Sequence, residues 1–395
     1  MSKLDDLINK LCPKGVEYKK LKDTVGVNRG RRLTKEQLSD EYSYEVYHGS
    51  KDTILGHYND WNAPEKTTIV VNTGGIGGVK YIDKNFWCSD GSFWLGSCKE
   101  INPKYLYYSL AGYEDYFFSK KRVGGVPTID KSVVEDFEIP VPPIEIQCEI
   151  VRILDNFTEL TAELTAELTA RKKQYEYYKQ WTFDLILDAE KVKITDIALV
   201  KARVGWQRLT TKEYLKEGDY CLITGTDFLG DGSINFDNTV FVSKERFDMD
   251  DNIKVHKNDI LITKDGTLGK VAILKDEPIK PTTLNSGVFR IHINDENKIN
   301  PKYIYYFFTS KYFTDFIESV KTGTTIPHLT QQGLLTLDIP VPSLQEQQQI
   351  VSILDRFDAL CNDITSGLPA EIEYRTKQYE YYRDKLLTFK RLEEK

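Results

Sequence analysis

Two short basic segments hold the residues of this chain that are best suited to contact a polyanion. Both place arginine or lysine beside glycine. Such side chains in a flexible context suit contact with phosphate oxygens or with guanine edges. A solvated loop can have the same composition, so each segment alone leaves both interpretations open. The basic residues are Arg29, Arg31 and Arg32 in the first segment, and Lys201 and Arg203 in the second.

Two glycine-rich turns could bring backbone amides close to phosphates. Each lies between two predicted strands, 68–73 and 79–82 in one case and 259–263 and 270–274 in the other. Glycine has no Cβ, so its backbone approaches an anion closely. A plain hairpin turn explains the spacing equally well, and neither turn opens a helix as a P-loop would. The candidate residues are Thr73, Gly74, Gly75, Gly77, Gly78 and Lys80, and then Lys264, Thr267 and Lys270.

A second pair of turns repeats cations and hydroxyl groups at matched places in the chain. The first is Arg122-Val123-Gly124-Gly125, and the second is Lys321-Thr322-Gly323-Thr324-Thr325. Repetition at matched places favours a binding role more strongly than any single turn does.

No arrangement of residues indicates catalysis. Asn102-Pro103-Lys104-Tyr105 and Asn300-Pro301-Lys302-Tyr303 resemble the Asn-Pro-Pro-Tyr element of adenine methyltransferases, but the second proline is absent. Asparagine as N-cap followed by proline at the first helical position explains both copies. The chain also lacks a glycine motif suited to S-adenosylmethionine, paired catalytic carboxylates and a nucleophile with a base. We therefore expect no catalytic residues, no bound metal and no cofactor in this chain.

A long-period repeat must position all these segments. Residues 137–157 and 337–357 are identical at eleven of 21 positions, and Lys173-Gln174-Tyr175-Glu176-Tyr177-Tyr178 returns at 377–382. A period near 200 is too long for a solenoid, so the repeating unit is a whole domain with a helix.

Each repeat contains a predicted amphipathic helix. Apolar residues recur at three- and four-residue steps after Pro143 and after Pro342. The first helix can run from about 144 to about 187, roughly 60 Å, which is too long for a compact domain and requires a partner helix. The second should kink or break at Gly367-Leu368-Pro369. The sequence thus predicts domains at 1–143 and 191–342, with helices at 144–190 and 343–395.

Composition narrows the class of protein. The chain has 395 residues, enough for two domains, and a net charge of −7. Each mixed domain holds equal numbers of basic and acidic residues, so a basic face remains compatible with the acidic total. The six cysteines form no CxxC pair, which favours reduced thiols and a cytoplasmic protein. We expect no membrane span, because no run approaches the required apolar length.

The order of these elements resembles the specificity subunits of type I restriction–modification systems. The resemblance covers essentially the whole chain and is most specific at the IPVP turns, the KQYEYY signatures and the Thr-Ala-Glu-Leu tetrads. It implies an α+β fold in which two long antiparallel coiled-coil helices separate two similar mixed α/β target-recognition domains, with a pseudo-two-fold repeat.

The resemblance also implies partners and residue roles. The partners would be double-stranded DNA, two modification subunits that carry the S-adenosylmethionine site, and ATP-dependent restriction subunits. DNA contact is assigned to the residues of the basic segments and glycine turns above, together with Arg122, Thr128, Thr224, Thr226, Lys321, Thr325 and His328. Subunit docking is assigned to Ile150, Leu154, Phe157, Tyr175, Tyr178, Ile350, Leu354, Phe357, Tyr379 and Tyr382.

The tetrads 161–164 and 165–168 suggest a helical spacer of adjustable length. A solvated simple-sequence expansion is the alternative. Four residues lengthen a helix by about 6 Å and turn it by about 40°. Two other classes of protein stay open from the sequence: a self-sufficient adenine DNA methyltransferase, and a scaffold that does not contact DNA.

Overall fold

The chain forms two compact units that divide the sequence unevenly. The computed structural model describes residues 3–122, 124–204, 209–323, 327–363 and 366–392. The first unit combines 1–164 with 372–395, and the second is the continuous segment 165–371. The first unit therefore contains both ends of the chain.

The first unit contains a four-stranded sheet in the order β2-β8-β5-β6, a three-stranded sheet in the order β4-β3-β7, and the pair β1-β9. Its helices α2 and α3 follow β8 along the chain. The elements are α1 (Lys3–Leu11), β1 (Tyr18–Lys20), η1 (Leu21–Asp23), β2 (Val27–Arg29), η2 (Lys35–Gln37), β3 (Tyr44–Tyr47), β4 (Gly56–Tyr58), β5 (Thr67–Val71), β6 (Val79–Ile82), β7 (Trp87–Cys88), β8 (Ser92–Leu95), α2 (Pro103–Ala111), α3 (Glu114–Ser119), α4 (Lys131–Glu135) and β9 (Glu138–Pro140).

The second unit repeats this topology. Its sheets are β11-β17-β14-β15, β13-β12-β16 and β10-β18. The elements are β10 (Lys191–Lys193), α6 (Ile194–Ile197), β11 (Ala198–Ala202), η4 (Thr211–Glu213), β12 (Tyr220–Ile223), η5 (Phe236–Asn238), β13 (Val240–Val242), α7 (Lys244–Phe247), η6 (Asp251–Ile253), β14 (Ile260–Thr263), β15 (Val271–Ile273), β16 (Thr282–Leu284), β17 (Val288–Ile293), α8 (Pro301–Phe308), α9 (Lys311–Val320), α10 (Gln331–Leu334) and β18 (Asp338–Pro340).

Strand pairing confirms that the two domains share one fold. In both, the four-stranded sheet is antiparallel throughout. In both, the central strand of the three-stranded sheet, β3 or β12, pairs with one neighbour antiparallel and with the other parallel. The duplication seen in the sequence therefore extends to strand order and direction.

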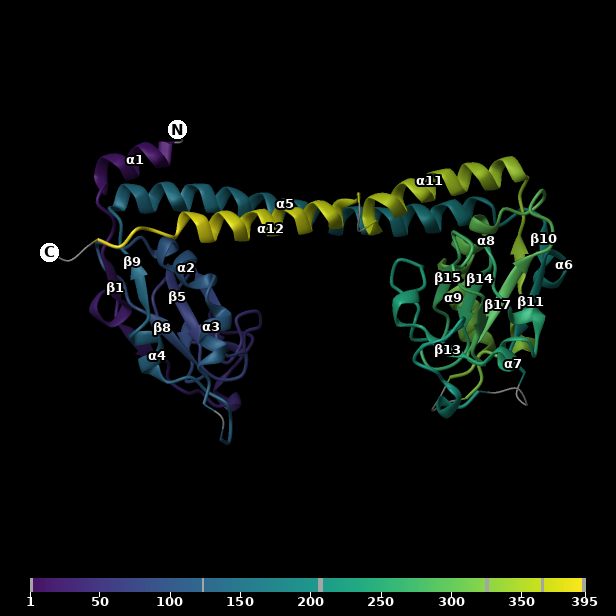
Figure 1. Ribbon diagram of the computed structural model, residues 1–395, viewed down its shortest axis with the longest axis horizontal. Coiled ribbons are helices and arrows are strands. Elements are labelled where there is room, and N and C mark those ends of the chain that lie inside the picture. Colours follow the sequence, from purple (N-terminus) through teal and green to yellow (C-terminus); the bar gives the residue numbers. More distant parts are fainter. Residues whose placement is uncertain (1–2, 123, 205–208, 324–326, 364–365, 393–395) are drawn as a thin grey trace. The chain divides into compact units, whose positions relative to one another are not determined.

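The long helices lie along one side of each domain (Figure 1). α5 (Ile144–Leu185) is one uninterrupted helix of 42 residues, as the sequence predicts. α11 (Leu344–Asn362) and α12 (Leu368–Leu386) replace a single second helix, and this confirms the predicted break at Gly367. A Cβ on Gly367 would lie 2.5 Å from the Ala359 carbonyl oxygen, so this turn requires glycine.

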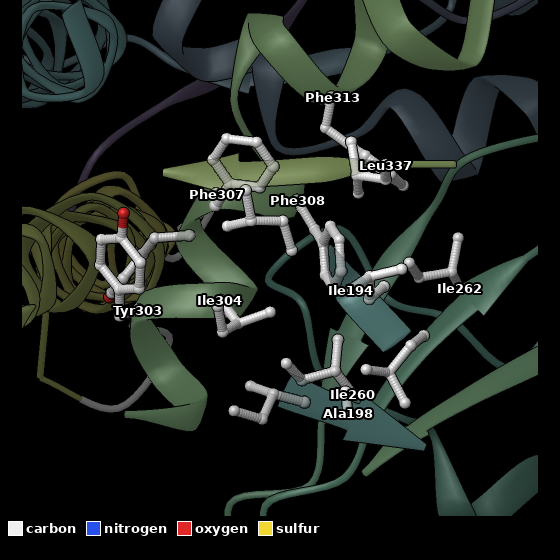
Figure 2. Close-up of a cluster of buried hydrophobic side chains, with 14 of the residues drawn as sticks. Ile194, Ala198, Ile260, Ile262, Tyr303, Ile304, Phe307, Phe308, Phe313 and Leu337 are labelled. Atoms are coloured by element: carbon white, nitrogen blue, oxygen red, sulfur yellow. The ribbon is translucent and has the colours of Figure 1, made fainter. Parts of the chain in front are cut away.

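Each unit is held together by a core that joins its domain to its helices. In the second unit, aromatic and aliphatic side chains of α8 and α9 pack against Ile260 and Ile262 of β14, and Figure 2 shows this cluster. The first unit has the equivalent cluster, which includes Leu106 of α2, Val70 of β5 and Leu154 of α5. Among the described residues, no helix combines the length and apolar character needed to cross a bilayer.

Equivalent aromatic contacts pair the helices within each unit. In the second unit, Tyr175 and Tyr178 of α5 stack on Phe357 of α11, with ring centroids 6.0 and 5.5 Å apart. In the first unit, Phe157 of α5 stacks on Tyr382 of α12 at 5.4 Å. α12 therefore has the place in the first unit that the second part of α5 has in the second.

Residues 390–392 meet the segment around Val16 in the first unit. The Val16 amide donates to the Lys390 carbonyl at 2.8 Å, and the Leu392 amide donates to the Val16 carbonyl at 3.0 Å. The Arg391 guanidinium lies 4.2 Å from the centroid of the Tyr18 ring. The segment after α12 thereby pairs with the residues before β1.

Candidate nucleic-acid interface

The two glycine loops have the same backbone conformation. In the first domain, residues 72–78 join β5 to β6, and the Gly77 amide donates to the Val71 carbonyl at 2.9 Å. In the second, residues 264–270 join β14 to β15, and the Gly269 amide donates to the Thr263 carbonyl at 2.9 Å. In both loops two glycines have φ between +70° and +87°, a backbone conformation that residues with a side chain rarely adopt. The glycines are Gly74, Gly77, Gly266 and Gly269.

A return hairpin lies against each glycine loop. In these hairpins, an isolated bridge joins Arg122 to Thr128 in the first domain and Thr322 to His328 in the second. A second bridge then joins the hairpin to the glycine loop, Thr73 to Thr128 in one domain and Asp265 to His328 in the other. The turns that the sequence separates by more than 50 residues are therefore neighbours in each domain.

In each domain a third loop lies beside the glycine loop. It follows β3 as residues 48–50 and β12 as residues 224–226. The Gly75 amide donates to the Gly49 carbonyl at 2.8 Å, and a Cβ on Gly225 would lie 3.6 Å from the Thr263 side chain. The sequence prediction included Thr224 and Thr226 but missed His48 and its neighbours. The glycine shared by the two loops is the signal that could have identified them.

The first basic segment borders this loop cluster. Arg32 and His48 line the same surface cleft of about 550 Å³. Gly30 cannot be replaced without a shift, because a Cβ there would lie 2.0 Å from the Ser89 carbonyl oxygen. The close approach of this backbone to Ser89 places the arginines beside the third loop.

In each unit, a lysine and a tyrosine of the domain donate to one aspartate of a long helix, and we call this set of contacts a latch. Asn102 caps α2 and accepts from the Lys104 amide at 2.9 Å, and Asn300 does the same for α8. These contacts confirm the N-cap interpretation of both Asn-Pro-Lys-Tyr segments. Lys104 and the Tyr108 hydroxyl both donate to Asp155 of α5 at 2.7 Å. The equivalent latch in the second unit joins Lys302 and Tyr306 to Asp355, also at 2.7 Å.

Comparison with known proteins identifies the duplicated domain. The family described as type I restriction modification DNA specificity domain matches residues 13–171 and 187–374. The chain belongs to this family. The chain is 33% identical to the type I restriction enzyme EcoR124I/EcoR124II specificity subunit of Escherichia coli over 382 residues, covering 89% of this chain and 88% of that one.

Further relatives of this specificity-domain chain agree. It is 29% identical to a protein of Haemophilus influenzae described as a putative type I restriction enzyme specificity subunit, with 95% of this chain and 96% of that one covered. Its fold resembles that of the S subunit of a type I restriction–modification system from M. genitalium, with TM-score 0.58, 20% identity, and 94% and 96% of the two chains covered. A chain from a type I system assembly has TM-score 0.59 at 15% identity, with 95% and 98% covered.

Most of the residues predicted to contact DNA are accessible in this specificity-domain fold. Thr325 lies outside the described residues. The exposed residues are Arg29, Arg31, Arg32, Gly74, Gly75, Arg122, Thr226, Thr267 and Lys270. The half-buried residues are Thr73, Lys80, Thr128, Lys201, Thr224, Lys264, Lys321 and His328. Their role in DNA contact stays a prediction.

Three of the predicted contacts are contradicted by burial. Arg203 is 1% exposed, and its guanidinium donates to the Leu284 carbonyl at 2.9 Å inside the second domain. Gly77 and Gly78 are buried as well. A Cβ on Gly77 would lie 2.5 Å from the Glu114 carbonyl oxygen, so this glycine allows α3 to approach the loop. Gly77 and Gly78 thus support their loop, and Arg203 supports the interior of the second domain.

The predicted docking residues are also wrong in part. Five of them are core residues of their own unit and cannot meet another subunit; they are Ile150, Leu154, Tyr175, Ile350 and Leu354. The other five are half-buried in ring contacts that hold the helices of their unit; they are Phe157, Tyr178, Phe357, Tyr379 and Tyr382. The apolar stripe of each helix faces its own domain, and other residues of the helices remain exposed.

Proposed function

We propose that this chain is the DNA-specificity subunit of a type I restriction–modification complex and reads a bipartite, asymmetric DNA site. One observation carries the proposal. In both domains the glycine loop, the return hairpin and the third loop lie together, but their side chains differ. Thr73 and Thr128 meet in the first domain, where Asp265 and His328 meet in the second. Equal folds with unequal surfaces suit the reading of two different half-sites.

The proposal assigns the chemistry to other subunits. A methyltransferase subunit would bind S-adenosylmethionine and modify adenine, and a restriction subunit would cleave DNA. Purified chain incubated with DNA and S-adenosylmethionine tests the alternative of a self-sufficient methyltransferase. Methylation by the chain alone would contradict a non-catalytic role.

Two methyltransferase subunits would dock on the exposed aromatic residues of the long helices. Tyr177, Trp181 and Leu185 follow one another at four-residue steps on α5 and are 65%, 47% and 64% exposed. On α12, Tyr374 and Tyr381 are 59% and 61% exposed. Exposed aromatic side chains at helical spacing are typical of protein interfaces.

Copurification tests this docking surface. Trp181→Ala should weaken capture of the methyltransferase subunit by about tenfold or more, as expected for a central aromatic contact. Trp61→Ala is the matched control, because Trp61 is 41% exposed on the first domain. Equal capture by both variants would contradict the surface assignment.

DNA binding is tested by gel shift of the chain with its methyltransferase partner. Arg31→Ala and Lys264→Ala should weaken binding to all sequences and reduce the salt slope by about one each, if they contact phosphates. Lys10→Ala on α1 is an exposed control that should change neither quantity. Unchanged salt dependence in both test variants would show that these loops are the wrong face.

A further inference from the structure

The bridge between the glycine loop and the return hairpin, here called the joint, is made of different side chains in the two domains. In the first, the Thr73 hydroxyl donates to the Thr128 hydroxyl at 3.2 Å. In the second, His328 Nδ1 is hydrogen-bonded to the Asp265 carboxylate. An imidazole N–H donates to a carboxylate whether the ring is neutral or charged, so the bond needs only the Nδ1–H form.

Backbone contacts establish that the two joints are equivalent. The Ile129 amide donates to the Asn72 carbonyl at 3.0 Å in the first domain. The Leu329 amide donates to the Lys264 carbonyl at 3.0 Å in the second. The equivalence therefore rests on backbone geometry and is independent of the side chains compared.

The joint lies beside the exposed parts of the loops. Gly266 and Thr267 follow Asp265 directly and are exposed, and a Cβ on Gly266 would meet no atom within 4 Å. The side chains of Asp265 and His328 are themselves 44% and 42% exposed. A change in the joint would thus act directly beside accessible loop atoms.

Charge argues against contact between Asp265 and the DNA backbone. A carboxylate beside a phosphate backbone is repelled, and this repulsion would oppose binding. Pairing with His328 gives the carboxylate a structural use, and Lys264 lies next to it in the chain. The same pairing occupies Nδ1 of His328 and leaves Nε2 as the ring nitrogen that a base could meet.

We propose that Asp265 and His328 are positioning residues for the second half-site. Their bond holds the return hairpin against the glycine loop, as the bond between Thr73 and Thr128 does in the first domain. For His328 this positioning role is an indirect one, and its direct contact with DNA stays a prediction. This inference rests on the proposed function.

The test exchanges one joint for the other. D265T and H328T each break the bond, whereas the double variant D265T/H328T imports the pair found in the first domain. Each chain is produced with its methyltransferase partner, and binding to randomised duplexes and the methylated motif in host DNA are sequenced. Each single variant should lower preference for the second half-site about tenfold, and the double variant should recover to within about threefold.

Two controls separate positioning from loss of folding. H328N keeps an N–H donor near the position of Nδ1 and should rescue half-site preference, while thermal unfolding reports the stability of every variant. Thr73→Val breaks the joint of the first domain and should affect only the first half-site.

Several outcomes would overturn the inference. One is a double variant as impaired as the single variants, which would make Asp265 or His328 a direct contact. Another is unchanged preference in both single variants. A wild-type complex that reads no split site would instead reject the proposed function, so the two failures are distinguishable.

Discussion

Arginine side chains occupy opposite environments in this chain. Arg31 is exposed, whereas Arg203 is buried and also donates to the Thr283 hydroxyl at 3.2 Å. Burial lowers the pKa of the Arg203 guanidinium. A buried donor of this kind stabilises the domain mainly because its removal leaves acceptors without a partner.

Arg203→Ala should therefore destabilise the second domain by about 2–4 kcal/mol, and Arg31→Ala should change stability by less than about 0.5 kcal/mol. Urea unfolding of both variants measures the difference. The salt slope of DNA binding should show the opposite pattern. Arg31→Ala should reduce the slope, and Arg203→Ala should leave the slope of the folded protein unchanged. Equal stability of the two variants would contradict the core role of Arg203.

Glu149 makes the stability of the first unit depend on pH. Hydrogen bonds from Arg152 and Lys3 lower the pKa of this carboxyl from 4.5 to about 2. A carboxyl with a lowered pKa in the folded state stabilises the fold above its ordinary pKa, and this contribution is lost as pH falls toward 2. We predict that Glu149→Gln lowers stability at pH 6 and flattens its decline between about pH 4.5 and 2. Urea midpoints measured along this range check the prediction, and parallel curves for the two proteins would contradict it.

At the scale of elements, each long helix is fixed by one aspartate that accepts from a lysine and a tyrosine. Burial, and then the neighbouring carboxylate, raises the pKa of the hydroxyl of Tyr108 and likewise that of Tyr306. Both hydroxyls therefore remain protonated donors at neutral pH.

We predict similar costs for breaking the two latches. Asp155→Ala should weaken the attachment of α2, and Asp355→Ala that of α8, each by about 1–3 kcal/mol, because two donors lose a charged acceptor. Hydrogen exchange should increase in the affected helix and not in its counterpart in the other unit. Glu159→Ala on the exposed face of α5 is the control. Equal exchange in all three variants would show that the latch contributes nothing.

Local elements were predictable, while their partners were not. The course of α5, the break near Gly367 and both N-caps follow from local signals, since proline, glycine and asparagine act on their own backbone. The periodicity of α5 gave the apolar stripe but not the surface that covers it, so Ile150 and Leu154 were misassigned. Burial of Arg203 depends on strands that are distant in sequence, and no local pattern encodes it.

For the whole molecule, the division between the two units falls near the middle of α5. Residues 144–164 belong to the first and 165–185 to the second. The tetrads lie on either side of this division, in a part of the helix without proline or glycine. A change in the number of tetrads would alter helix length without altering either domain.

Deletion of Thr165–Leu168 should shorten the gap between the half-sites by about one base pair. Four residues remove about 6 Å and 40° of helical turn, and that rotation is close to the twist of DNA per base pair. Both half-sites should stay unchanged, because no domain residue is removed. Methylome sequencing of a strain that carries the deletion measures the gap. An unchanged gap would contradict the spacer role of α5.

The pairing of residues 390–392 with Val16 affects the order in which the two units can complete their folding during translation. The second unit is continuous and has all its residues once Glu371 has emerged. The first unit, although translated first, lacks Tyr379, Leu386 and Phe389 of its apolar contacts until the last segment is made. The domain that is synthesised first is thus completed last, and a nascent chain would hold one finished domain while the other still awaits its closing helix.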